Sequence, residues 1–175
     1  MDYITNIKEF GPLLETPNHT DVKMTEGEVN LSEFIASMLS YRPWWIRFLF
    51  RIREIFVRIL GLVRHEIPEK FPVLRPEDIP FTPGETVAFF TVCFSKEGEY
   101  WVGETPEDKH LTAYLGVVME PLKEKINRFH VITIVRYIHW TGPVYFNLIR
   151  PFHHLVVRRM MKAGVRKTIS HLGNN

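Results

Sequence analysis

The chain has 175 residues, which is the length of one domain with a substantial hydrophobic core. Its net charge of +2 is too small to predict binding to nucleic acid, and its single cysteine, Cys93, excludes an internal disulfide and a cysteine-rich zinc site. The first residues contain no apolar signal core, so a cytoplasmic protein is expected. We therefore expect a single domain over residues 1–175, with its core at about 20–164.

The first part of the chain predicts loops followed by a helix. Residues 1–29 are mixed in composition and loop-rich, with one short strand expected at 21–24. A helix is predicted over 31–39, with Asn30 or Ser32 as its N-terminal cap.

A strongly apolar helix is predicted over residues 44–60, beginning at Trp44. Its arginines at positions 47, 51, 53 and 58 exclude a transmembrane helix, because each costs about 2.5–3.5 kcal/mol near the bilayer centre. Three interpretations remain for its second apolar stripe, which consists of Ile46, Phe50 and Val57. The stripe is buried against the 31–39 helix, or it lies on a membrane surface, or it binds a partner, including a second copy of the chain in a homodimer.

Strand patterns fill most of residues 85–140. The predicted strands are 85–95, 100–103, 110–120 and 128–140, after an extended loop at 67–84 that holds five of the twelve prolines. Short polar turns separate the strands, which predicts an antiparallel meander. Consecutive strand residues such as Phe89 and Phe90 are both large and apolar, so both faces of the predicted sheet carry apolar side chains and must be covered. Helices before the sheet and one helix after it predict an α+β fold.

The last predicted element is a long helix from Pro143 to Gly164, with Thr141 or Gly142 as its cap. At about 100° per residue, one narrow face carries five apolar side chains and one histidine: Tyr145, Ile149, Phe152, Val156, Met160 and His153. His153 is a candidate ligand contact or proton-transfer group. The alternative is a core histidine that is hydrogen-bonded to a neighbour.

Motifs for catalysis and metal binding are not evident. The sequence contains no glycine-rich phosphate loop, no Gly-x-Ser-x-Gly elbow and no His-Glu-x-x-His pair. A polar cluster can be assembled from Asp108 and His110 at one strand entry, Arg136 and His139 near a strand end, and His153. The spacing of these histidines matches no known metal motif, so neither a metal nor another cofactor is expected. The basic C-terminal tail lacks interleaved aromatic residues that would stack on bases, so no nucleic-acid partner is expected.

Several motifs in residues 20–164 resemble an uncharacterised bacterial family whose members share a domain of unknown function. They are Asp108-Lys109-His110-Leu111, the run from Val135 to Gly142, Tyr145-Phe146, Arg150-Pro151-Phe152-His153 and Arg158-Arg159-Met160. That family is similar to the helix-grip superfamily, which includes START lipid-transfer domains, polyketide cyclases and birch-pollen-allergen-like proteins. The resemblance implies a curved antiparallel sheet that grips a long C-terminal helix, with a hydrophobic cavity between them. It implies no particular catalytic residue.

Three functions are compatible with these features. The first is binding of a hydrophobic small molecule or lipid in the cavity between sheet and terminal helix, lined by Tyr145, Ile149, Phe152, His153, Val156 and Arg136. The second is a cyclase, dehydratase or hydrolase that uses His153 with Arg136 or Asp108 in that cavity. The third is a protein-interaction or membrane-surface module that works through the 44–60 helix.

Overall fold

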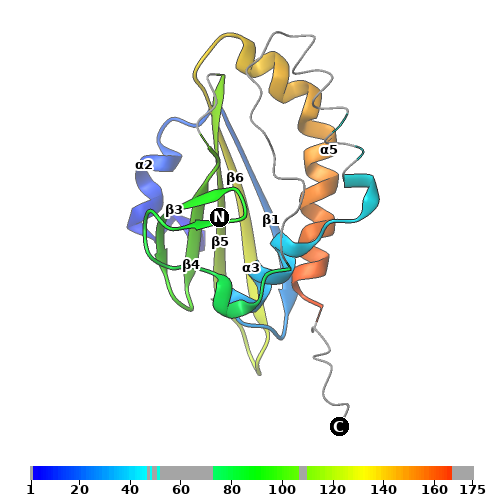
Figure 1. Ribbon diagram of the computed structural model, residues 1–175. Helices are drawn as coiled ribbons and strands as arrows, with labels where there is room; N and C mark the ends of the chain where they lie inside the picture. The colour runs from blue at the N-terminus through cyan, green and yellow to red at the C-terminus, as the bar shows by residue number, and fades with distance from the viewer. Residues whose placement is uncertain (1, 47, 49–50, 52–72, 107–109, 167–175) are drawn as a thin grey trace.

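The computed structural model describes residues 2–46, 48, 51, 73–106 and 110–166, which form an α+β fold around one antiparallel sheet (Figure 1). The helices are α1 (Asp2–Thr5), η1 (Lys8–Phe10), α2 (Gly11–Leu14), α3 (Leu31–Ser40), η2 (Pro76–Asp78) and α5 (Thr141–Gly164), where η marks a 3-10 turn. The strands are β1 (His19–Gly27), β2 (Thr86–Val87), β3 (Phe90–Lys96), β4 (Tyr100–Glu104), β5 (Leu111–Pro121) and β6 (Asn127–Tyr137).

The strands lie in the order β1-β6-β5-β4-β3-β2, and every neighbouring pair is antiparallel. The predicted meander is confirmed for β2 to β6, while β1 pairs with the far side of β6. The predicted strand 128–140 ends earlier, at Tyr137, and two other strand predictions are wrong. β1 spans 9 residues instead of the short strand expected at 21–24, because polar residues on both of its faces hide the strand pattern. The predicted strand 85–95 is a hairpin of β2 and β3, since the chain reverses at Ala88, whose φ is 56°.

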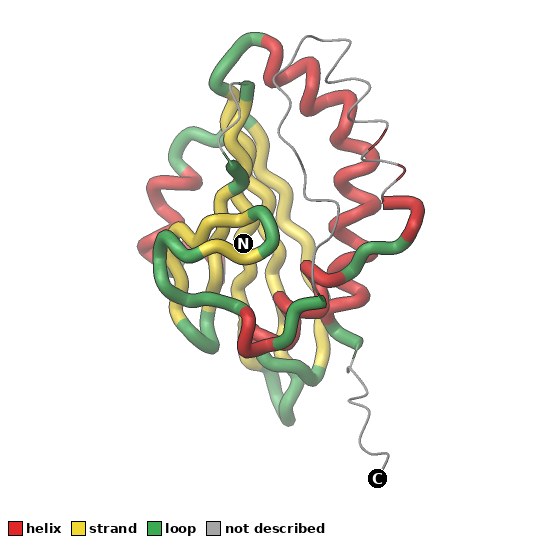
Figure 2. The backbone as a smooth tube through the Cα atoms, in the orientation of Figure 1, coloured by secondary structure: helices red, strands yellow, loops and turns green. Residues whose placement is uncertain are grey.

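Helices cover both faces of the sheet, and Figures 1 and 2 show α2 on one side and α5 on the other. Because successive residues of a strand point to opposite faces, β6 divides its side chains between the two layers. Phe129 and Val131 pack with α3 and α5, whereas Ile132 and Ile134 pack with Phe10 of the N-terminal segment. The prediction that both faces are covered is therefore confirmed. The N-terminal cover itself was not predicted, because its helical turns are too short to show a helical period.

α3 packs between the sheet and the C-terminal end of α5. Its predicted cap is confirmed: the Asn30 side chain accepts from the Glu33 backbone N–H, and the Glu33 carboxylate accepts from the Asn30 backbone N–H. Phe34 stacks on Phe129 of β6 with ring centroids 4.1 Å apart, and both rings are fully buried. Gly164 packs against the same ring, so that a Cβ added at Gly164 would lie 2.7 Å from Phe34 Cδ2. The α3–α5 contact therefore depends on a ring on one helix and a glycine on the other.

The predicted helix at 44–60 lies mostly outside the described residues. Residues 44–46, 48 and 51 are helical, with Ile46 buried and with Trp44 and Phe48 exposed. Phe50 and Val57, on which the three interpretations of the second stripe depend, lie outside the described part of the chain. None of the helices formed by described residues is long and apolar enough to cross a membrane.

α5 begins at a tight junction directly after β6. Its N-cap residue is Trp140, which has no side-chain cap, so the prediction of Thr141 or Gly142 as the cap is wrong. The helical turn starts earlier because the Gly142 N–H already donates to the His139 carbonyl oxygen. Pro143 lies in the first turn, as expected. Gly142 is also packed so closely that an added Cβ would lie 2.6 Å from the His110 carbonyl oxygen.

Gly142→Ala should lower the free energy of unfolding by about 1–3 kcal/mol, because the extra methyl group forces α5 away from the entry of β5. Urea denaturation measures this change. Gly11→Ala is the matched control, since a Cβ at Gly11 meets no atom within 4 Å. Equal stability of the two variants would contradict the close approach at the junction.

Candidate ligand-binding cavity

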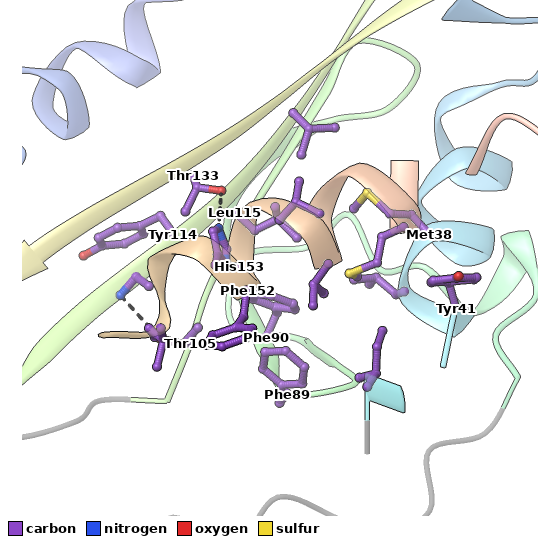
Figure 3. A pocket seen from close by; sticks show the side chains of 18 of the residues that line it. Met38, Tyr41, Phe89, Phe90, Thr105, Tyr114, Leu115, Thr133, Phe152 and His153 are labelled. Carbon is purple, nitrogen blue, oxygen red and sulfur yellow. Dashed lines mark hydrogen bonds between the residues drawn. The ribbon is translucent and has the colours of Figure 1, made fainter. Parts of the chain in front are cut away.

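A cavity of about 300 Å³ lies between α5, α3 and the face of the sheet that points toward α5 (Figure 3). The α5 wall includes Ile149, Phe152, His153 and Val156. The opposite walls include Met38 of α3, Phe90 of β3, Leu115 of β5, Val131 and Thr133 of β6, and Tyr41 and Arg42 after α3. Most of these side chains are apolar, and a few polar groups stand among them. This composition is typical of sites for small molecules.

Four of the six residues predicted to line the cavity lie in its wall: Ile149, Phe152, His153 and Val156. Tyr145 does not join them. It is buried in a separate cluster with Leu111, Val135 and Phe146, closer to the start of α5. The prediction for Tyr145 is therefore wrong: its side chain fills core space between α5 and the sheet.

Arg136 lies on the opposite face of the sheet, and its prediction as a cavity residue is also wrong. Its guanidinium donates to the carbonyl oxygen of Pro12 in α2. Even-numbered residues of β6 point toward the N-terminal helices, as Ile134 does, whereas Thr133 points toward α5. Joint action of Arg136 and His153 in one active site therefore has no geometric basis.

His153 of α5 lies in the cavity wall, and its imidazole reaches β6 of the sheet (Figure 3). Its Nε2 lies 3.2 Å from Thr133 Oγ1, within hydrogen-bond distance. Burial, with smaller contributions from the nearby His154, Lys23 and His19, lowers the pKa of His153 to about 4. The imidazole is therefore uncharged at neutral pH, with one nitrogen as a donor and the other as an acceptor.

A polar cluster that was not predicted lies beside the cavity, between β1 and α5. His19, Asp21 and Lys23 alternate along β1 and share the face that points toward α5. Lys23 bonds to Asp21, and its Nζ lies 2.9 Å from Nδ1 of His154. Burial is the largest cause that lowers the pKa values of His19, Lys23 and His154. The alternation of polar residues was a usable signal, but the strand expected at 21–24 is too short to include it.

The polar residues predicted at the strand ends come together away from the cavity. His110 Nδ1 and His139 Nδ1 lie 2.6 and 3.0 Å from the hydroxyl oxygen of Thr141. Neither histidine lines the cavity, and Asp108 lies outside the described residues. Within the described ranges, no group of three or more histidine, cysteine or carboxylate side chains is arranged to hold a metal ion. The histidine pair instead fixes the junction between β6 and α5.

Cys93 is not activated as a nucleophile. Its Sγ lies 3.8 Å from a carboxylate oxygen of Glu104. Burial and the negative charge of Glu104 raise the pKa of the Cys93 thiol to about 11. The thiol therefore stays protonated at neutral pH, which makes it a poor nucleophile.

A curved antiparallel sheet that packs against a long C-terminal helix with an apolar cavity between them defines a helix-grip protein. The helix-grip fold expected from the family resemblance is thus confirmed. Residues 13–160 match the family described as "Protein of unknown function (DUF2867)", and the chain belongs to this family. No curated protein matches the sequence significantly.

Several solved structures are similar to this chain in fold. Norcoclaurine synthase from Thalictrum flavum, solved in complex with dopamine and hydroxybenzaldehyde, is 10% identical with a TM-score of 0.44, and 89% of each chain is covered. A START superfamily protein from Mycobacterium smegmatis is 14% identical with a TM-score of 0.42, covering 85% of this chain and 97% of the other. Ara h 8.0201 is 10% identical with a TM-score of 0.42, covering 83% and 97%.

Proposed function

We propose that the protein binds an apolar small molecule or a lipid in the cavity between α5 and the sheet. The observation that carries this proposal is the cavity of about 300 Å³ with a predominantly apolar wall. An apolar space of this size, set between core elements and open at the surface, favours a bound ligand because small-molecule sites are mostly apolar concave pockets. Its volume lies at the lower end of the range for small-molecule sites, roughly 300–1,000 Å³.

His153 and Thr133 supply the polar contact that orients the ligand. Their hydrogen bond places an uncharged imidazole in an otherwise apolar part of the wall. A hydroxyl or carbonyl group of the ligand suits such an imidazole, because each of these groups is satisfied by a neutral partner. A carboxylate at the same position would be buried beside a group without charge, which is unfavourable.

Val156→Trp is expected to weaken binding of the neutral apolar dye Nile red about tenfold or more, because the indole occupies space that the ligand needs. Fluorescence titration measures the affinity, and urea denaturation confirms that the variant is folded. Val144→Trp is the matched control, since Val144 is on the same helix but is 53% exposed and does not line the cavity. Unchanged affinity in folded Val156→Trp would contradict the proposal.

Native mass spectrometry of the purified protein tests the same proposal without a dye. We expect a retained apolar compound, or uptake of one from a panel of fatty alcohols, sterols and aromatic alcohols. A protein that retains no compound and takes up none from the panel would contradict the proposal.

A further inference from the structure

Charge is distributed very unevenly along this chain. All 20 acidic residues lie within residues 1–124, whereas nine of the 22 lysine and arginine residues lie within 125–175. α5 illustrates the asymmetry, since its 24 residues include Arg150, Arg158, Arg159 and Lys162 but no aspartate or glutamate. Such a charge imbalance indicates that a segment meets an anionic surface.

The same helix exposes a continuous apolar stripe. Val144, Leu148, Phe152 and Leu155 are 53%, 36%, 42% and 46% exposed, and we call them the α5 stripe. Their spacing of three and four residues places them on one side of the helix. Arg159 and Lys162 continue this side toward the C-terminal end, and both are exposed. The helix therefore presents an apolar stripe that ends in two cations.

The α5 stripe is also the edge of the cavity. Leu148 and Phe152 belong to the stripe and line the cavity, so the cavity reaches the surface there. Another part of the cavity wall is Ile46, whose helical neighbours Trp44 and Phe48 are 75% and 58% exposed. Exposed aromatic and aliphatic side chains thus come from two segments that share one cavity.

We propose that the α5 stripe docks on a lipid bilayer that carries anionic headgroups, with the cavity edge facing the acyl region. An exposed apolar side with cations and no acidic residue is the pattern of a helix that lies in the membrane interface. Arg159 and Lys162 meet the headgroups, and the stripe enters the boundary between headgroups and acyl chains. Membrane docking goes beyond ligand binding, because it lets an apolar ligand enter or leave the protein at the cavity edge.

Sedimentation with vesicles of equal parts phosphatidylserine and phosphatidylcholine at low ionic strength tests the proposal on the full chain. The wild type should sediment, and the double variant Val144→Ser/Leu155→Ser should partition about tenfold more weakly. Both residues are exposed and neither lines the cavity, so the variant should keep its stability and its affinity for Nile red. Met24→Ser is the matched control, because Met24 is 63% exposed on β1, away from α5.

The cations are tested by Arg159→Gln/Lys162→Gln. Each cation near an anionic bilayer strengthens partitioning about fivefold, so the double variant should lose roughly 25-fold. Its binding should also depend less on salt than that of the wild type. Arg75→Gln, at the exposed N-cap position just before η2, is the matched charge control and should bind like the wild type.

Three outcomes would overturn the proposal. The first is a wild type that does not sediment with these vesicles, and the second is equal binding of the wild type and both α5 double variants. The third is a dimer in light scattering that only Val144→Ser/Leu155→Ser dissociates, because the α5 stripe would then be a contact between two copies of the chain. Val156→Trp separates this proposal from ligand binding. That variant should lose the dye but still sediment with the vesicles, so failure of either property is detected independently.

Discussion

The free energy of unfolding should fall by roughly 3 kcal/mol more in the wild type than in His153→Gln as the pH drops from 6.5 to about 4. The pKa of His153 is about 4 in the folded protein and 6.5 in the unfolded chain, so the unfolded state binds the proton first. Stability from the uncharged imidazole is therefore fully present above pH 6.5 and is lost as the pH falls to the folded value. Glutamine does not titrate, yet it keeps a donor and an acceptor for Thr133.

Urea denaturation at about pH 7 and about pH 4 measures the difference. Some loss of stability should remain in the variant, because His19 and His154 also have lowered pKa values. His139→Gln is the matched control, since His139 is exposed at the β6–α5 junction, away from the cavity. An equal loss of stability in the wild type and in His153→Gln would show that the imidazole is not buried uncharged.

Phe34→Ala should lower the free energy of unfolding by about 3–5 kcal/mol, the largest single change that we expect. The substitution removes a fully buried ring that stacks on Phe129 at 4.1 Å. It also removes the surface against which Gly164 places the end of α5. Chemical denaturation at neutral pH provides the measurement, and Met24→Ala, at an exposed position on β1, should change stability little.

A double-mutant cycle between Phe34 and Gly164 isolates the contact between the two helices. Gly164→Ala alone should destabilise the protein, because its Cβ would lie 2.7 Å from the Phe34 ring. In the Phe34→Ala background the cost of Gly164→Ala should fall. It should not vanish, since the Phe34 carbonyl oxygen would still be 3.1 Å away. Additive effects of the two substitutions would contradict direct packing.

Much of the fold was predictable because its main elements carry regular patterns and clear ends. α3 has a cap at Asn30 and an apolar period, and α5 has Pro143 in its first turn. The N-terminal cover of the sheet was not predictable, since its four-residue helical turns have no period and Phe10 is buried only through tertiary contacts. Ala88 was missed as a turn because the strands on both sides of it are apolar.

The candidate site was predictable where the helical period alone decides which way a side chain points. This holds for Ile149, Phe152, His153 and Val156, which share the cavity side of α5. The direction of the Arg136 side chain was not predictable, because both faces of β6 are apolar. The register that decides which face a residue joins is set by pairing with β1 and β5. The His19–Lys23 cluster was missed for a related reason, since its residues become neighbours of His154 only after β1 pairs with β6.

The position of β1 beside β6 has a consequence for the order of events during synthesis. Asn18, just before β1, accepts a hydrogen bond from the Tyr137 N–H at the end of β6, and 119 residues separate them. β1 therefore leaves the ribosome long before the strand that holds it, and contacts of such long range form slowly. α5 emerges later still. The cavity is thus completed only after α5 has left the ribosome, because its walls come from α3, the sheet and α5 together.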